Sequence, residues 1–174
     1  MGDSKMYSKF VRLVDQLNDW VGKGVAWLAA AMVALTVYDV GARYLLKAGS
    51  VALQELEWHL FAVNFLIAAG WVLKEGGHVR VDLIFIRMSP RLQQIVDLVG
   101  SILLCIPFCV LVIWTSIPFV ESSMSMGEGS PDPGGLPARY VLKAMLPLGF
   151  GLVLLQAVSE ALKKAMLLKS RKEA

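Results

Sequence analysis

The sequence predicts an all-α integral membrane protein with four transmembrane helices, and three observations lead to this prediction. The chain has 174 residues, of which 56% are hydrophobic and only 18% are charged, whereas a soluble domain carries about 25% charged residues. The apolar residues lie in four blocks, each long enough for the roughly 20 residues that a spanning helix needs. The Lys and Arg residues gather in the segments at one end of these blocks.

The first expected element is an amphipathic helix within residues 1–24. Its apolar residues recur at helical spacing, with charged residues between them: Phe10, Leu13, Val14, Leu17, Trp20 and Val21. This pattern predicts a helix that lies on the cytoplasmic membrane surface, although packing against a partner subunit would produce the same pattern. No apolar core or small-residue cleavage site follows the first charges, so we expect no cleavable signal peptide here.

The four spans follow within one transmembrane domain, residues 25–162, and a basic cytoplasmic tail occupies residues 163–174. We expect the spans at about 25–46, 53–73, 95–120 and 144–162. The glycine pair Gly76-Gly77 should end the second span, as glycine commonly ends helices. The Gly- and Pro-rich loop 126–140 should form a shaped turn without helix, because each proline fixes a backbone angle.

The charge distribution sets the expected orientation. Of the 17 Lys and Arg residues, thirteen lie in the N-terminal segment, in the loop between the second and third spans, and in the tail. An even number of spans places these three segments on one side. Since Lys and Arg are in excess on cytoplasmic segments, we expect both termini in the cytoplasm.

Charged residues near the outer ends of the first two spans are the main candidates for function. Asp39 and Arg43 are four residues apart, so they share a helix face, and Glu55 and Glu57 stand at the mouth of the second span. A charge at the bilayer centre costs about 2.5–3.5 kcal/mol on insertion scales, and such residues are functional candidates by default. Interfacial charges that simply pair with one another are the alternative interpretation.

The two histidines raise the alternative of a membrane haem or quinone electron-transfer subunit. His59 and His78 lie near opposite ends of the second span, about 30 Å apart at the helical rise of 1.5 Å per residue. They cannot share one metal, although one of them could pair with a partner's ligand. A self-sufficient four-helix exporter is a third, weaker possibility. The sequence holds no nucleophile–base pair, phosphate loop or nucleic-acid motif, so we expect neither enzyme activity nor nucleic-acid binding.

Two sequence blocks resemble the small, DctQ-type membrane subunit of TRAP (tripartite ATP-independent periplasmic) transporters. The first block is "RYLLKAGSVALQELEWHLFAVNFLIAAGWVLKEGGHVRVD", with Arg43-Tyr44, the acid-Leu pair Glu55-Leu56 and Gly77-His78-Val79 followed by Asp82. The second, "GEGSPDPGGLPARYVLKAMLPLG" at residues 127–149, resembles the mannitol/chloroaromatic or 2-oxo acid branch. Together the blocks cover most of residues 25–162.

The resemblance implies a non-catalytic subunit in the inner membrane of a bacterium. In that family a large M subunit carries the sodium and substrate sites and moves as an elevator, and a periplasmic binding protein (the P subunit) delivers the substrate. The small subunit would brace the scaffold of the large subunit in a sodium-coupled importer of an organic acid, and would help to dock the binding protein. Its expected partners are these two proteins and membrane lipids. No cofactor is expected in this chain, and sodium is expected in the large subunit.

The resemblance also implies which residues contact other helices or subunits. Under it, Arg43 and Glu55 would pair and join the first two helices. The candidates for contacts between helices or subunits are Asp39, Arg43, Tyr44, Glu55, Glu57, Trp58, His78, Arg80 and Asp82. The candidates for docking the periplasmic partner are Glu128, Asp132 and Arg139.

Overall fold

The computed structural model describes residues 2–77 and 85–173, and the side chains of residues 6–77 and 85–168. These ranges are helical apart from short connections and contain no strand. The elements are α1 (Gly2–Leu45), α2 (Val51–Lys74), α4 (Pro90–Gly100), the π-helical turn η1 (Ser101–Cys105), α5 (Ile106–Ser125) and α6 (Arg139–Glu173). Four helices are long and apolar enough to cross a membrane, the third made of α4, η1 and α5 together. The predicted all-α, four-span architecture is therefore confirmed.

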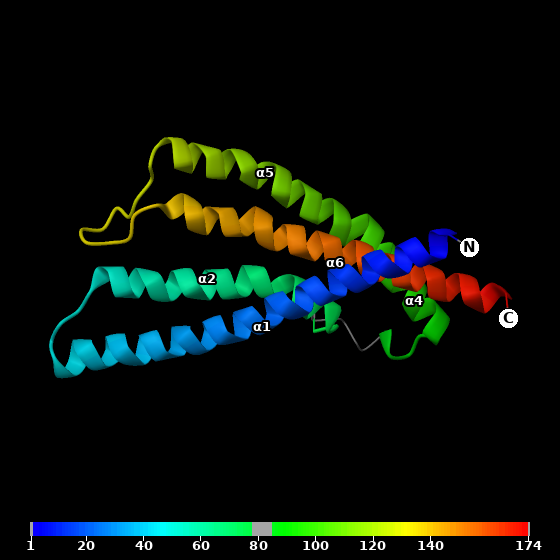
Figure 1. Ribbon diagram of the computed structural model, residues 1–174, viewed down its shortest axis with the longest axis horizontal. Coiled ribbons are helices and arrows are strands. Elements are labelled where there is room, and N and C mark those ends of the chain that lie inside the picture. The colour runs from blue at the N-terminus through cyan, green and yellow to red at the C-terminus, as the bar shows by residue number, and fades with distance from the viewer. Residues whose placement is uncertain (1, 78–84, 174) are drawn as a thin grey trace.

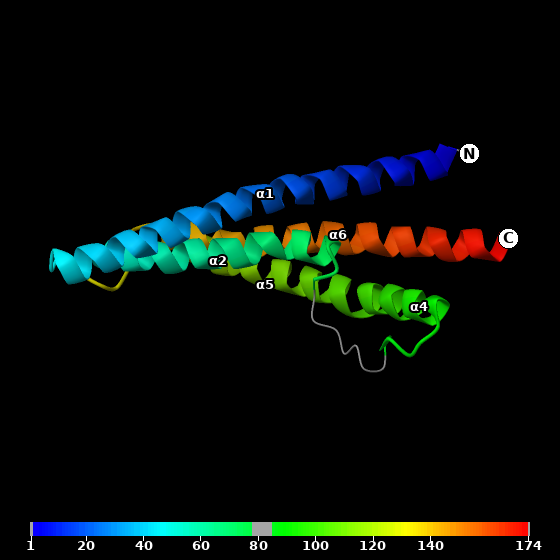
Figure 2. The same ribbon diagram turned by 90° about the horizontal axis from the view of Figure 1, so that it is seen from below.

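The helices run lengthwise in a bundle organised around α6 (Figure 1). Helix α6 packs against α1, α2, α4 and α5, and α1 also packs against α2. The N- and C-termini lie at the same end of the bundle (Figures 1 and 2), as an even number of spans requires. We call this end the terminal end, and the opposite end, where residues 126–138 connect α5 to α6, the loop end.

Helix α1 differs from the expected interfacial helix followed by a separate span, because it runs unbroken from Gly2 to Leu45. Tertiary packing explains this continuity. Val14 and Asn18 are buried, and a Cβ atom on Gly22 would lie 2.6 Å from the indole ring of Trp71 in α2. One face of the N-terminal segment is thus held by the bundle itself, while a neighbouring face with Leu13 and Trp20 stays exposed.

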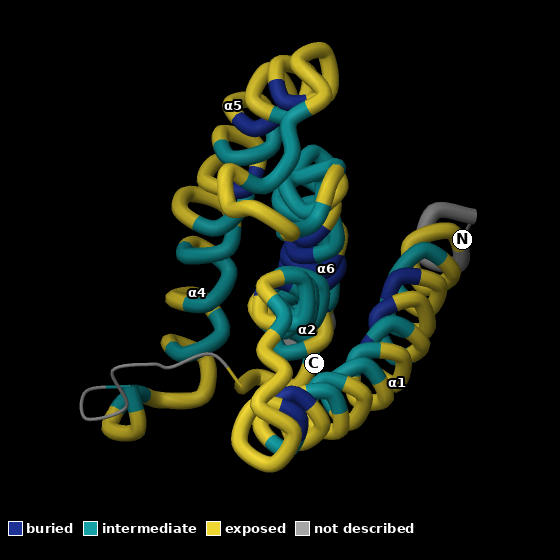
Figure 3. Tube along the Cα trace, turned by 90° about the vertical axis from the view of Figure 1, so that its left-hand side faces the viewer, coloured by how far each residue is buried: buried dark blue, intermediate teal, exposed yellow. Residues whose placement is uncertain are grey.

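Few residues of the bundle are buried (Figure 3). Most of the buried ones are small or polar, whereas many large apolar residues are exposed. Trp27 and Leu45, for example, are 80% and 84% exposed. Lipid tails solvate such side chains as well as a protein core would, so close helix contacts in membranes favour small residues. The buried apolar residues are Val14, Ala42, Cys109, Val153, Ala157 and Ala161, and the buried polar ones are Asn18, Asp39, Glu55, Ser116, Ser123, Gln156 and Ser159.

One helix end and one helix irregularity follow from local sequence. Helix α2 ends at Lys74, and Gly76 has the positive φ of 69° that glycine accepts without strain, which confirms the predicted stop. In the third span Pro107 lacks an N–H group, and the π-helical turn η1 precedes it, with the Ile106 N–H bonded to the Ser101 carbonyl oxygen. The π turn shifts the hydrogen-bond register just before the proline.

Candidate functional site

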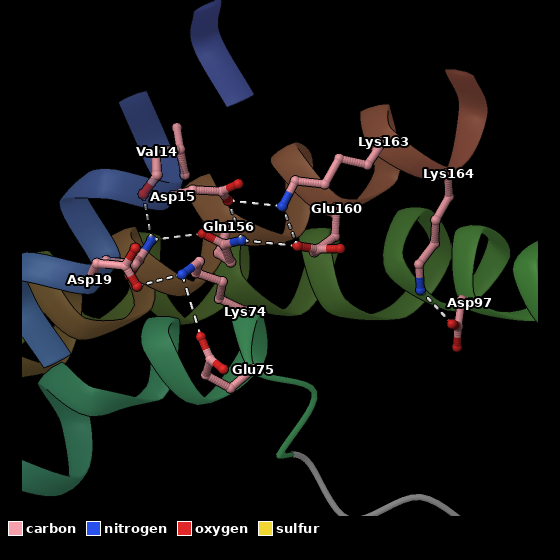
Figure 4. A network of polar contacts seen from close by, with 11 residues as sticks. Val14, Asp15, Asp19, Lys74, Glu75, Asp97, Gln156, Glu160, Lys163 and Lys164 are labelled. Atoms are coloured by element: carbon pink, nitrogen blue, oxygen red, sulfur yellow. Dashed lines mark hydrogen bonds and ion pairs between the residues drawn. The ribbon is translucent and has the colours of Figure 1, made fainter. Parts of the chain in front are cut away.

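A cluster of polar side chains joins α1 to α6 near the terminal end (Figure 4). The buried amide of Asn18 donates from Nδ2 to Gln156 Oε1 at 2.9 Å. Gln156 Nε2 in turn donates to Asp15 Oδ1 and to Glu160 Oε1, both at 3.0 Å. The Lys163 ammonium contacts the same two carboxylates, at 2.9 Å from Asp15 and 2.7 Å from Glu160. We call these five residues the terminal-end cluster.

Helix α2 is attached to this cluster through a second ion pair and a close backbone approach. Lys74 pairs with Asp19 of α1 and, at 3.3 Å, with Glu75 (Figure 4). A Cβ atom on Gly70 would collide with Asn18 Oδ1 and would lie 3.1 Å from the Leu152 backbone. Helices α1, α2 and α6 therefore approach one another closely here. The approach requires a glycine at the contact, and polar side chains pair across it.

No residue of the terminal-end cluster is among the candidates that the sequence pattern indicated. The available signal was Gln156, an amide inside an otherwise apolar span, together with Asn18 and Asp15 at helical spacing. A buried amide requires a hydrogen-bond partner, but sequence alone does not say which helix supplies it.

The loop end is fastened by the carboxylate of Glu55, which is buried at the start of α2. This carboxylate accepts hydrogen bonds from the Ser130 hydroxyl and from the Leu136 backbone N–H, the latter at 2.6 Å. Arg139 Nη2 lies 3.3 Å from Glu55 Oε1, and the Arg139 guanidinium lies 5.7 Å from the centre of the Trp58 ring. We call Glu55, Trp58, Ser130, Leu136 and Arg139 the loop-end cluster.

The connection between α5 and α6 is ordered by its own hydrogen bonds as well as by Glu55. The Ser130 N–H donates to the Leu136 carbonyl at 2.9 Å, and the Arg139 N–H donates to the Glu128 carbonyl at 2.8 Å. Gly134 adopts a φ of 81°. The predicted shaped, non-helical loop is confirmed between Ser125 and Arg139, where α5 ends and α6 begins.

The expected pair of Arg43 with Glu55 is wrong. Arg43 pairs with Asp39 on its own helix, because residues four apart face each other across one turn. Glu55 is instead occupied by the loop and by Arg139. Arg43 still reaches α2, because the Gln54 amide oxygen, in its hydrogen-bonding orientation, accepts from Arg43 Nη2 at 2.8 Å.

The remaining interface candidates fall into three groups. Tyr44 forms the first group and is exposed. Glu57 and Asp39 form the second, because the buried Glu57 Oε1 and Asp39 Oδ1 atoms have no hydrogen-bond partner among the described residues. His78, Arg80 and Asp82 lie outside the described residues.

The three docking candidates are not equally available to a partner. Asp132 is exposed. Glu128 pairs with Lys143 and is half-buried, with 30% of its side chain exposed. Arg139 is turned toward Glu55 within the chain. Of the three side chains, Asp132 is thus the most open to a protein arriving at the loop end.

The histidine that suggested haem ligation makes a contact within its own helix. His59 Nδ1 lies 2.6 Å from the Glu55 carbonyl oxygen, and its ring centre lies 4.0 Å from that of Trp58. Within the described residues, no group of three or more His, Cys, Asp or Glu side chains is arranged to hold a metal ion.

Replacing Glu55 by glutamine is expected to release the loop end. A neutral amide keeps the shape but loses the charge-assisted hydrogen bonds from Leu136 and Arg139, which are the stronger kind. Hydrogen exchange should then accelerate in residues 126–138, and proteases should cleave there. Glu57→Gln, two residues along α2, is the matched control and should leave the loop protected. Equal protection in wild type and Glu55→Gln would show that Glu55 does not hold the loop.

The Glu128–Lys143 pair predicts a pH dependence of stability. The hydrogen bond from Lys143 lowers the pKa of Glu128 below its ordinary value of 4.5, so the ionised carboxylate stabilises the folded state above that pH. This contribution is lost as the pH falls through the lowered pKa. The melting temperature of wild type should exceed that of Glu128→Gln at neutral pH, and the difference should vanish in acid. A difference that persists unchanged in acid would contradict the assignment.

Comparison with known protein families identifies the chain. Residues 32–166, more than half of its length, match the family model described as tripartite ATP-independent periplasmic transporters, DctQ component. No curated protein matches it. The matched region contains the loop-end cluster, the Asp39–Arg43 pair and three members of the terminal-end cluster. The match and the four spanning helices together show that this multi-pass membrane protein belongs to the DctQ family, the small permease subunits of TRAP transporters.

Proposed function

We propose that this subunit is a rigid brace for the large membrane subunit of a sodium-coupled importer of an organic acid. One observation carries the proposal: the buried polar groups near both ends of the bundle are used mainly to fasten its own helices together. Gln156 binds α1 at the terminal end, and Glu55 binds the loop and α6 at the loop end. A subunit whose helices are cross-linked by polar contacts near both ends is suited to support a partner that changes conformation.

The outer surface offers apolar area for a partner helix as well as for lipid. Three exposed aromatic residues of α1 share one face of the helix, because Trp20, Trp27 and Tyr38 are separated by seven and eleven residues, close to whole numbers of turns. Aromatic side chains are enriched where membrane helices meet the interfaces and at protein contacts. We propose that the large subunit covers part of this face of α1.

The excess of Lys and Arg at the terminal end supports a cytoplasmic location for both termini in the bacterial inner membrane. The loop end then faces the periplasm, where Asp132 and the partly exposed Glu128 are available to the substrate-binding protein. The hydrogen bonds of Glu55 with Ser130, Leu136 and Arg139 fix the conformation of that loop. Less conformational entropy of the loop is therefore lost when the binding protein docks.

Co-expression with the large subunit tests the brace. We expect the two proteins to co-purify, and sodium-dependent uptake into proteoliposomes should require both of them together with the binding protein. The small subunit alone should move no solute. Uptake by the small subunit alone would overturn the proposal, as would full activity of the large subunit without it.

An absorption spectrum separates this proposal from an electron-transfer role. The purified complex should lack a Soret band, since His59 would act as a helix-packing residue. A Soret band that disappears in His59→Ala would favour the haem subunit instead.

A further inference from the structure

We propose that α1 carries a second helix-packing face, which binds one long helix of the large membrane subunit. That helix continues beyond the bilayer at the terminal end and carries acidic residues beside the contact. This assignment rests on the proposed function, since it names the surface by which the brace holds its partner. It is carried by an exposed apolar stripe on α1, by the level of that stripe relative to the membrane, and by the charges beside it.

An apolar stripe runs along α1 on a face that the described residues leave uncovered. Its large side chains are all exposed and recur after three, four, seven or eleven residues, close to whole numbers of helical turns. They are Met6, Leu13, Leu17, Trp20, Trp27 and Tyr38. We call these six residues the α1 stripe. It is distinct from the face that packs on α2 and α6, which includes Asn18 and Gly22.

The end of α2 marks the level at which α1 leaves the membrane. The 24 residues of α2 extend about 36 Å at the helical rise of 1.5 Å per residue, enough to cross a hydrocarbon core of about 30 Å. The last of them, Lys74, pairs with Asp19 of α1, so Asp19 lies near the membrane boundary at the terminal end. Beyond this level α1 and α6 both continue past α2 (Figures 1 and 2).

Part of the α1 stripe therefore lies outside the bilayer. Leu13 and Met6 precede Asp19 in the chain by roughly 9 Å and 20 Å of helix. The headgroup layer adds only about 5–7.5 Å on each side of the hydrocarbon core, so lipid does not reach these two side chains. Leu13 is nonetheless 66% exposed, and contiguous apolar groups left open to water mark an interaction site.

The two parts of the stripe call for one occupant that belongs to a membrane protein. Trp27 and Tyr38 lie on the membrane side of Asp19, whereas Met6 and Leu13 lie beyond it, and α1 is unbroken between them. Lipid could cover only the first pair, and a soluble protein only the second. A single membrane helix that extends past the bilayer covers both, and the large subunit is the membrane partner that this chain is proposed to brace.

The middle of the stripe has room for the side chains of a facing helix. Gly24 lies four residues after Trp20 and three before Trp27, and a Cβ atom on it would meet nothing within 4 Å. Ala31 stands one heptad later, and both small residues are exposed. A small residue between two indole rings leaves a hole into which a side chain of the facing helix can insert, and small residues favour close helix contacts in membranes.

The charges beside the stripe favour a partner with acidic residues. Lys9 and Lys23 are exposed, and the Lys23 ammonium lies 5.6 Å from the centre of the Trp20 ring. The nearby acids Asp15 and Asp19 already pair with lysines of α6 and α2. A second copy of this chain would bring like charges to the contact, whereas carboxylates on a helix of the large subunit would complement them.

Photo-crosslinking in the co-purified complex tests the surface. Benzoylphenylalanine placed at Leu13 or at Trp27 should crosslink to one and the same helix of the large subunit. The two crosslinked positions should lie roughly 21 Å apart along that helix, the separation of Leu13 and Trp27 on α1, with acidic residues within one turn of the contact. Leu104 of the third span is the matched control, because it is similarly exposed, and it should not crosslink to that helix.

Several crosslinking results would overturn the assignment. Crosslinks to a second copy of this chain would give the stripe to self-association, and adducts with lipid alone would leave it without a protein partner. A crosslink at Trp27 without one at Leu13 would mean that the partner helix ends inside the bilayer. In each case the complex still co-purifies and the proposed brace stands, whereas failure of the wild-type subunits to co-purify would overturn the brace itself.

The affinity between the purified subunits measures the aqueous part of the contact. Leu13→Asn should weaken binding of the large subunit about tenfold, which corresponds to about 1.4 kcal/mol, because the contact would enclose an amide in place of an apolar side chain. Leu92→Asn, at an exposed leucine of α4, is the matched control and should bind as wild type does. Both variants alone should keep the wild-type melting temperature, since both side chains are exposed. Unchanged affinity in Leu13→Asn would overturn the assignment.

Charge reversal tests the acidic side of the partner. Lys9→Glu combined with Lys23→Glu should weaken binding, and the loss should be larger at low salt, where surface charges are less screened. Replacing the acidic residues of the crosslinked helix with lysine should then restore binding. Failure of this compensating change would overturn the proposed charge pairing.

Discussion

Gly149→Leu is expected to lower the free energy of unfolding by about 3 kcal/mol, at the upper end of the cost of overpacking a tight contact. A Cβ atom on Gly149 would lie 2.5 Å from the carbonyl oxygen of Leu66 and 2.9 Å from its carbonyl carbon. Both are backbone atoms of α2, so no side-chain rotation relieves the clash. The gain in helix propensity on replacing glycine is only about 1 kcal/mol, so the clash outweighs it.

Gly151→Leu provides the matched control on the same helix. A Cβ atom at Gly151 meets nothing within 4 Å, so this substitution should leave the free energy of unfolding unchanged or slightly higher. Denaturant unfolding of the purified protein in a mild detergent measures both variants. Equal stability of the two would mean that α2 and α6 do not approach each other as closely as described.

Gln156→Leu is expected to cost about 2 kcal/mol, in the range for stranding a buried hydrogen-bonding group. Leucine keeps approximately the volume of the side chain but removes its contacts with Asn18, Asp15 and Glu160. The detachment of α1 from α6 should also raise hydrogen exchange in the N-terminal part of α1. Gln16→Leu makes the same chemical change at an exposed position of α1 and should have little effect.

A double-mutant cycle decides whether Gln156 acts through Asn18. If their hydrogen bond carries the effect, Asn18→Leu should cost less in the Gln156→Leu background than in wild type, since partners in one network do not add. Strictly additive losses would show that the two amides stabilise the bundle independently.

The candidate site was only partly accessible to sequence reasoning. Asp39, Arg43 and Glu55 were selected because charges in apolar spans are costly, and all three do make polar contacts. The partners were harder to predict, since Glu55 bonds with residues 75 to 84 positions away. Gln156 was not selected because it carries no charge, and no local signal identifies the distant residues of α1 that it contacts.

The sequence by itself determined the number of spanning helices, the stop at Gly76 and the shaped loop before α6. These features depend on local composition, on helix length against bilayer thickness and on backbone preferences of glycine and proline. Only the tertiary structure decided that α1 continues unbroken to Gly2, that Glu55 holds the loop in place of Arg43, and that Gln156 joins α1 to α6. Each of these features depends on contacts between residues that are far apart in the chain. Local sequence patterns do not indicate which distant residues come into contact.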